Sequence, residues 1–165
     1  MSISKSKKIA TFSLYSALVC IATFIHVPIP GYRIYFNLGE GAIYTIAILF
    51  GGAAGGIAGG LGSALADLIL GYPLWAPFTL VIKGIEGFVV GKVGKKNKVL
   101  ALSIGATVMI TGYSLAAGFL YGIGAIPVEA LTDLVQCSVG ILVALPLVRI
   151  LHKSSLEEKL QINNK

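Results

Sequence analysis

The sequence predicts an all-α, polytopic membrane protein that folds as a bundle of six transmembrane helices. Hydrophobic residues make up 56% of the chain and charged residues only 12%, whereas soluble domains carry about 25% charged residues. The mean hydropathy is +0.87. The basic residues are not scattered but gather between apolar runs, so the net charge of +6 indicates membrane topology and argues against a basic patch for RNA.

The apolar runs approach the roughly 20 residues that a spanning helix needs. We expect helices over residues 9–27, 41–50, 56–70, 77–93, 99–121 and 127–151. Pro-Ile-Pro-Gly at 28–31 ends the first helix, and Gly-Tyr-Pro at 71–73 ends the third. Pro77 suits the first turn of the fourth. The second and third helices are short for a full crossing, so four or five spans remain possible.

The basic residues support six spans. Of the 13 lysines and arginines, 11 fall within residues 5–8, 92–98 and 149–165. Six crossings place these three clusters on one side, which the positive-inside rule identifies as the cytoplasm. Both termini are therefore expected to be cytoplasmic. We expect one membrane domain over residues 1–153 and a polar, frayed cytoplasmic tail over 154–165.

No motif for catalysis or metal binding is evident. The glycines of segment 51–62 recur every four residues, a spacing typical of close helix packing. The segment lacks the lysine with which a phosphate loop ends. Cys20 and Cys137 lie inside apolar runs, and His26 and His152 are isolated. We therefore expect no enzymatic activity, no metal and no cofactor, with Cys20 and Cys137 serving packing.

The acidic residues outside the tail fall in the half of the membrane opposite the basic clusters. A charge in hydrocarbon costs about 2.5–3.5 kcal/mol, so such residues usually pair, face the bundle interior or line a pathway. Lys83 and Glu86 are three apart on one helix. They either neutralise each other or form a wall of a ligand cavity. Asp67 and Asp133 have no partner nearby in sequence, which favours a functional role.

Aromatic residues gather in the same half of the membrane. They are Tyr32, Tyr35, Phe36, Tyr72, Trp75, Phe78, Tyr113 and Tyr121. One interpretation is an interfacial aromatic belt. The other is a pocket whose rings stack on a flat ligand and whose few charged groups orient it. The coincidence of aromatic and charged residues favours the pocket. Because both charge signs are expected to line it, no strongly charged ligand is demanded.

Three stretches carry a family resemblance: YFNLGE at 35–40, GSALADLILGY at 62–72 and PFTLVIKGIEG at 77–87. They resemble the substrate-binding S components of energy-coupling factor (ECF) vitamin transporters, in the riboflavin, pyridoxine and hydroxymethylpyrimidine branch. The second half of the chain is similar mainly in hydropathy and length. The resemblance implies a six-helix bundle in a prokaryotic cell (plasma) membrane. It also implies capture of one vitamin or precursor near the extracellular side.

The resemblance further implies partners and site residues. The partners would be a transmembrane coupling subunit and two separate ATPase subunits. Docking on the coupling subunit would use Ser13 and Ala17 on the first helix, where serine replaces the first alanine of the usual Ala-x-x-x-Ala. We therefore expect Ala17→Trp to block transport and spare binding, and Lys83→Ala to weaken binding more than folding. The candidate ligand contacts are Asn37, Glu40, Asp67, Trp75, Lys83, Glu86, Tyr113, Tyr121, Asp133 and Gln136.

Two other functional classes fit the sequence less well. A small channel or secondary transporter would need polar faces through the full depth of the membrane. The first and fifth helices have few polar groups in their cytoplasmic halves, which argues against a continuous pore. A structural membrane protein without a ligand would not need Asp67, Lys83, Glu86 and Asp133 in the outer half.

Overall fold

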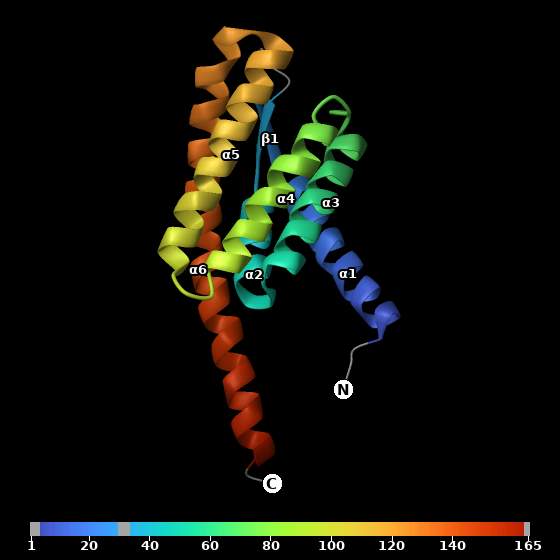
Figure 1. Ribbon diagram of the computed structural model, residues 1–165, viewed down its shortest axis with the longest axis vertical. Helices are drawn as coiled ribbons and strands as arrows, with labels where there is room; N and C mark the ends of the chain where they lie inside the picture. The colour runs from blue at the N-terminus through green and yellow to red at the C-terminus, as the bar shows by residue number, and fades with distance from the viewer. Residues whose placement is uncertain (1–3, 30–33, 164–165) are drawn as a thin grey trace.

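The computed structural model describes residues 4–29 and 34–163, with side chains through residue 153. Within these ranges the chain forms six α-helices and a short antiparallel hairpin (Figure 1). The helices are α1 (Lys5–Phe24), α2 (Gly39–Phe50), α3 (Gly52–Leu70), α4 (Ala76–Val93), α5 (Lys98–Tyr121) and α6 (Ile126–Asn163). The hairpin pairs β1 (His26–Ile29) with β2 (Ile34–Asn37), and the 3-10 turn η1 (Ile123–Ala125) precedes α6.

The lengths of the helices fit a multi-pass membrane protein. Among the described residues, four segments are long and apolar enough to cross a membrane: α1, α3, α5 and residues 123–153. Helix α2 has 12 residues, or about 18 Å, which is less than the roughly 30 Å hydrocarbon core. Helix α4 has 18 residues and carries Lys83 and Glu86 among its buried side chains. The expected shortness of the second helix is confirmed, whereas the third is longer than predicted.

Glycines bring α3 and α4 into close contact. A Cβ atom on Gly59 would lie 2.8 Å from the Lys83 carbonyl oxygen, and one on Gly60 would lie 2.8 Å from the Leu80 carbonyl oxygen. Side chains larger than glycine would force the two backbones apart. The glycine-rich segment therefore serves helix packing, as its spacing predicted.

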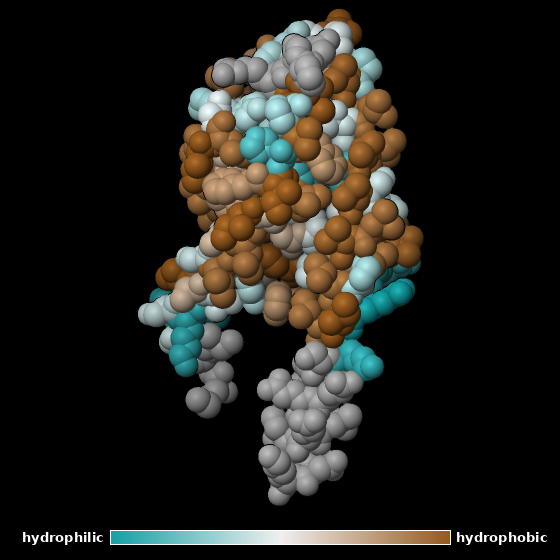
Figure 2. Space-filling model, turned by 180° about the vertical axis from the view of Figure 1, so that it is seen from behind, coloured by the Kyte–Doolittle hydropathy of each residue, from teal (hydrophilic) through white to brown (hydrophobic). Residues whose placement is uncertain are grey.

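The two ends of the bundle differ in character. The N-terminus, the α4–α5 connection and the C-terminal part of α6 lie at one end (Figure 1). The hairpin, the α3–α4 connection and the α5–α6 connection lie toward the other end. Figure 2 shows hydrophobic surface over the middle of the molecule and hydrophilic side chains at the end that carries the N-terminus. The basic clusters thus share one end, as six helices require.

Two predictions about the ends of helices were wrong. The first helix stops at Phe24, not at residue 27, because the chain turns into the hairpin there. The backbone after residue 153 continues α6 as far as Asn163, so this segment is helical and not frayed. Residues 30–33, which hold part of the Pro-Ile-Pro-Gly breaker and Arg33, lie outside the described residues.

Candidate ligand-binding site

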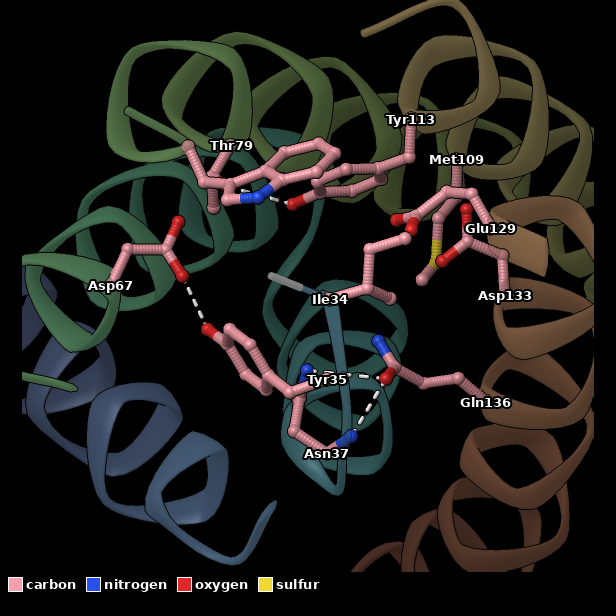
Figure 3. A pocket seen from close by; sticks show the side chains of 11 residues that line it. Ile34, Tyr35, Asn37, Asp67, Thr79, Met109, Tyr113, Glu129, Asp133 and Gln136 are labelled. Carbon is pink, nitrogen blue, oxygen red and sulfur yellow. Dashed lines mark hydrogen bonds between the residues drawn. The ribbon is translucent and has the colours of Figure 1, made fainter. Parts of the chain in front are cut away.

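A cavity lies between the hairpin and helices α3, α4, α5 and α6 (Figure 3). Its lining residues come from the C-terminal part of α3, the start of α4, the second half of α5 and the first turns of α6, so it sits away from the basic clusters. Its volume is about 330 Å³ including the open mouth. It is lined by Ile34, Tyr35, Asn37, Asp67, Trp75, Thr79, Met109, Tyr113, Glu129, Asp133 and Gln136.

Strand β2 is held in place by a hydrogen-bond network around Asn37. The backbone N–H and the Nδ2 group of Asn37 donate to Gln136 Oε1 at 2.7 and 3.1 Å. The Asn37 Oδ1 atom accepts from the Gly39 N–H at 2.8 Å, at the first residue of α2. One buried side chain thus joins β2, α2 and α6. Because these polar groups are paired with one another, the network holds the C-terminal end of β2 in a fixed position against α2 and α6.

Aromatic rings form a second wall. The ring centroids of Trp75 and Tyr113 are 5.7 Å apart, and the Tyr113 hydroxyl donates to Thr79 Oγ1 at 3.0 Å. The Tyr35 hydroxyl donates to the Asp67 carboxylate, as Figure 3 shows. Burial and the neighbouring Asp67 raise the pKa of Tyr35 above its usual value. Tyr35 therefore stays protonated and acts as a donor.

A buried ion cluster lies beside the cavity. Lys83 Nζ contacts Glu40 Oε1 and lies 3.3 Å from Glu86 Oε2. The Tyr44 hydroxyl donates to Glu86 Oε1 at 2.8 Å. The side chains of Lys83, Glu40 and Glu86 are 3%, 0% and 0% exposed. We call these three residues the Lys83 cluster; it ties the start of α2 to the middle of α4.

Two lining residues connect the Lys83 cluster to the cavity. Met109 Sδ lies 2.9 Å from Lys83 Nζ, and Gln136 Nε2 donates to Glu40 Oε1 at 3.3 Å. Gln136 thus contacts Asn37 with its oxygen and Glu40 with its nitrogen. The Lys83 cluster therefore contacts the residues that line the cavity, but its own members are not part of the lining.

The structure brings six of the ten predicted contacts into the cavity lining: Asn37, Asp67, Trp75, Tyr113, Asp133 and Gln136. Glu40, Lys83 and Glu86 form the Lys83 cluster instead, because each pairs with another member across α2 and α4. Tyr121 lies outside the lining and packs against Trp75 with ring centroids 5.9 Å apart. The expectation that both charge signs line the pocket is therefore revised. Among the described lining residues, every charged group is acidic.

Five lining residues were not among the ten predicted contacts: Ile34, Tyr35, Thr79, Met109 and Glu129. Tyr35 does belong to the aromatic group from which the sequence predicted a pocket. Glu129 had a usable signal, because it lies one helical turn before Asp133 and shares its face. Thr79 falls inside the 77–87 stretch that carries the family resemblance. Ile34 and Met109 are apolar and carry no signal that distinguishes them from core residues.

Helix α1 carries two pairs of small residues spaced four apart, Ser13 with Ala17 and Ser16 with Cys20, and the two pairs face different ways. Ser16 and Cys20 are buried, and the backbone of Ser16 packs closely against Gly62 of α3. Ser13 and Ala17 are exposed and line an apolar groove between α1 and α3. The predicted docking residues thus lie on the surface of the bundle, on the side away from the cavity-lining elements α5 and α6.

The chain is similar to known transport proteins. The family of ECF-type riboflavin transporter S components matches residues 3–153. The thiamine precursor transporter HmpT of Lactococcus lactis subsp. cremoris (strain MG1363) is 29% identical over 91% of this chain and 90% of that protein. An uncharacterized protein of Pyrococcus woesei, from the gap 3′ region, is 44% identical over 83% of this chain and 95% of its own length.

A solved structure of the S component of a bacterial ECF transporter has the same fold. It superposes with a TM-score of 0.66 and covers 90% of this chain and 99% of that one, at 23% sequence identity. This similarity extends over the whole bundle, including the second half, where sequence reasoning found only matching hydropathy.

Proposed function

The chain belongs to the family of ECF-type riboflavin transporter S components, and from this premise we propose which ligand it captures and how it is coupled. As an S component it is a substrate-binding subunit of a vitamin transporter and not itself an enzyme. It binds a small vitamin ligand and associates with the partners of an ECF module. The proposal concerns the ligand, the residues that hold it, the composition of the module and the orientation in the membrane.

The observation that carries the proposal is the cavity described above. It combines aromatic walls with paired polar groups from five elements, an arrangement typical of small-molecule sites. We propose that the ligand contacts are Asn37, Asp67, Trp75, Tyr113, Asp133 and Gln136, and that Glu40, Lys83 and Glu86 support them. Tyr121 contributes through its packing on Trp75.

The ligand is a small, flat heterocycle. The volume of about 330 Å³ counts the open mouth, so the enclosed part of the cavity is smaller than that. Its size favours a single ring of the pyridoxine or hydroxymethylpyrimidine type over the three fused rings of riboflavin. The similarity to a protein named as a thiamine precursor transporter supports a precursor of this kind.

The orientation follows from the charges. The basic clusters mark the cytoplasmic end, so the cavity opens near the extracellular side of a prokaryotic cell membrane and both termini are cytoplasmic. We propose one membrane domain over residues 1–153 and a cytoplasmic tail over 154–165, in which α6 continues as far as Asn163.

Energy is expected to come from separate subunits. The partners are a transmembrane coupling subunit, which docks on α1 at Ser13 and Ala17, and two ATPase subunits that hydrolyse ATP. The exposed apolar groove at these residues supports the docking surface. No resident cofactor is required for capture.

Tryptophan fluorescence tests the proposal directly. The chain has one tryptophan, and Trp75 lines the cavity, so every change in tryptophan emission reports on this site. Titration of the detergent-purified protein with pyridoxine, hydroxymethylpyrimidine, riboflavin and thiamine should give saturable quenching by a single-ring ligand. The Asp133→Asn variant changes one lining residue and should bind the same ligand more weakly than the wild type does. Flat titrations with every vitamin would contradict the proposal.

A further inference from the structure

We propose that Glu129 and Asp133 determine the specificity of the cavity, by binding the N–H groups of a single-ring nitrogen heterocycle and excluding anionic ligands. This inference rests on the proposed function. It adds one residue, Glu129, to the ligand contacts and states what chemical group the ligand must present.

Several hydrogen-bond donors of the lining are already paired within the protein. The donors of Asn37 are used by Gln136, the Gln136 amide donates to Glu40, and the Tyr113 hydroxyl donates to Thr79. The Tyr35 hydroxyl donates to Asp67. Each of these donor groups already has a partner within the protein.

Among the described lining residues, three carboxylate oxygens remain without a partner, Asp67 Oδ2 on α3 and one oxygen each on Glu129 and Asp133 of α6. Asp67 is already bonded to Tyr35 through its other oxygen, whereas the two residues on α6 have no such bond to a described lining hydroxyl. Glu129 Oε2 and Asp133 Oδ2 are buried and have no hydrogen-bond partner, and the two residues are only 5% and 3% exposed. Figure 3 shows both carboxyl groups directed into the cavity beside Met109. Buried polar groups in proteins are nearly always paired, so two unpaired carboxylate oxygens facing one cavity indicate the place of a donor from a ligand.

The nearest cation cannot serve them. Lys83 is held between Glu40 and Glu86, and it does not line the cavity. Among the described lining residues none is basic. Glu129 and Asp133 also lie four apart on one helix, where like charges repel. Without a ligand, the site thus holds two buried acceptor atoms one helical turn apart, and no donor among the described residues bonds to either.

A ligand with N–H groups would relieve this arrangement. An amino group or a protonated ring nitrogen can donate to both carboxylates, and hydrogen bonds to charged groups are the strong class. The rings of Trp75 and Tyr113 can stack on the face of the same ligand, and a cationic ligand ring would add a cation–π attraction. A phosphate group would instead bring negative charge against the two carboxylates.

The test compares matched ligands by Trp75 fluorescence. The probes are an aminopyrimidine bearing a hydroxymethyl group, the analogue with methyl in place of the amino group, the phosphate ester, and riboflavin. The wild-type protein should bind the amino compound at least tenfold more tightly than the other three. Loss of one hydrogen bond to a charged group is expected to cost about tenfold to a hundredfold in affinity. Glu129→Gln and Asp133→Asn should each show that loss and discriminate less against the phosphate ester.

A second readout separates ligand recognition from a structural role. Because each variant removes one of two repelling charges, its melting temperature without ligand should equal or exceed that of the wild type. A structural role would lower it. Ser138→Ala, on the same helix but exposed and bonded to the Leu134 carbonyl, is the matched control and should change neither reading.

The outcomes distinguish the two claims. Preference for riboflavin or the phosphate ester, equal binding of the methyl analogue, or unchanged affinity in both variants would overturn this inference and leave the proposed function standing. A wild-type protein that binds none of these compounds and no other vitamin would overturn both.

Discussion

Replacing Lys83 by alanine should destabilise the fold strongly, because it leaves Glu40 and Glu86 buried without their cation. The sequence alone led us to expect a loss of binding larger than any loss of stability. The structure leads us to expect a large effect on stability as well, since Lys83 contacts Glu40, lies 3.3 Å from Glu86 Oε2 and is 3% exposed. It supports the cavity through Met109, through Glu40 and Gln136, and through the Tyr113 ring, whose centroid lies 5.2 Å from Lys83 Nζ.

The magnitude follows from the geometry. Breaking a buried ion pair by removing one partner costs about 3–5 kcal/mol, because the remaining charge is uncompensated. Glu86→Gln should cost less than half as much, because Lys83 keeps Glu40 and the Tyr44 hydroxyl can still donate to the new amide oxygen. Lys92→Ala is the matched control on the same helix. Lys92 is exposed and lies 5.5 Å from the Phe88 ring centroid, a contact of about 0.5–1 kcal/mol.

The assay is equilibrium unfolding in mixed detergent micelles, with ligand titration of each folded variant. If Lys83→Ala is too unstable to purify, the triple variant Lys83→Met, Glu40→Gln, Glu86→Gln removes all three charges and should recover stability. A Lys83→Ala protein within 1 kcal/mol of wild type would refute the reasoning. If that protein had also lost its ligand affinity, Lys83 would be a direct ligand contact.

Three further variants test other parts of the account. Ala17→Trp fills the exposed groove between α1 and α3; it should abolish uptake by the complete transporter and leave affinity unchanged, and loss of binding would make α1 a core element. Gly59→Ala places a Cβ 2.8 Å from the Lys83 carbonyl oxygen and should lower stability by about 1–3 kcal/mol, whereas Gly124→Ala, which meets nothing within 4 Å, should be neutral in the same unfolding assay. Gln136→Leu removes the acceptor of the two Asn37 donors, so it should lower the free energy of unfolding by about 1–3 kcal/mol and weaken the quenching of Trp75 by ligand. Unchanged quenching would show that other contacts position the hairpin.

Helices were the predictable part of this fold. Apolar runs and Pro or Gly breakers located all six, and the start of the fourth was off by a single residue, Ala76 instead of Pro77. The hairpin was missed because its strands have four residues each and contain Pro28, too short for a periodic signal. The helical end of α6 was missed because hydropathy marks where membrane burial ends, whereas Glu, Lys, Leu and Gln remain good helix formers beyond that point.

The location of the site was predictable from the sequence, but the long-range ion pair among its charged residues was not. Sequence placed the aromatic and acidic residues in one half of the membrane, and the local pair Lys83 and Glu86 is present at 3.3 Å. The stronger contact joins Lys83 to Glu40, 43 positions away. No local spacing encodes such a contact, because it depends on how α2 and α4 cross. Lys83 lies in this buried cluster beside the cavity. Glu129 lines the cavity and was left out of the predicted contacts although its spacing from Asp133 was available in the sequence.

The most direct test of the central claim is to identify the small molecule that co-purifies with the protein in mild detergent, by mass spectrometry followed by titration. We predict a stoichiometric single-ring vitamin or vitamin precursor that quenches Trp75 when added back. An empty protein that also fails to bind pyridoxine, hydroxymethylpyrimidine, riboflavin and thiamine would contradict capture of a vitamin by this cavity.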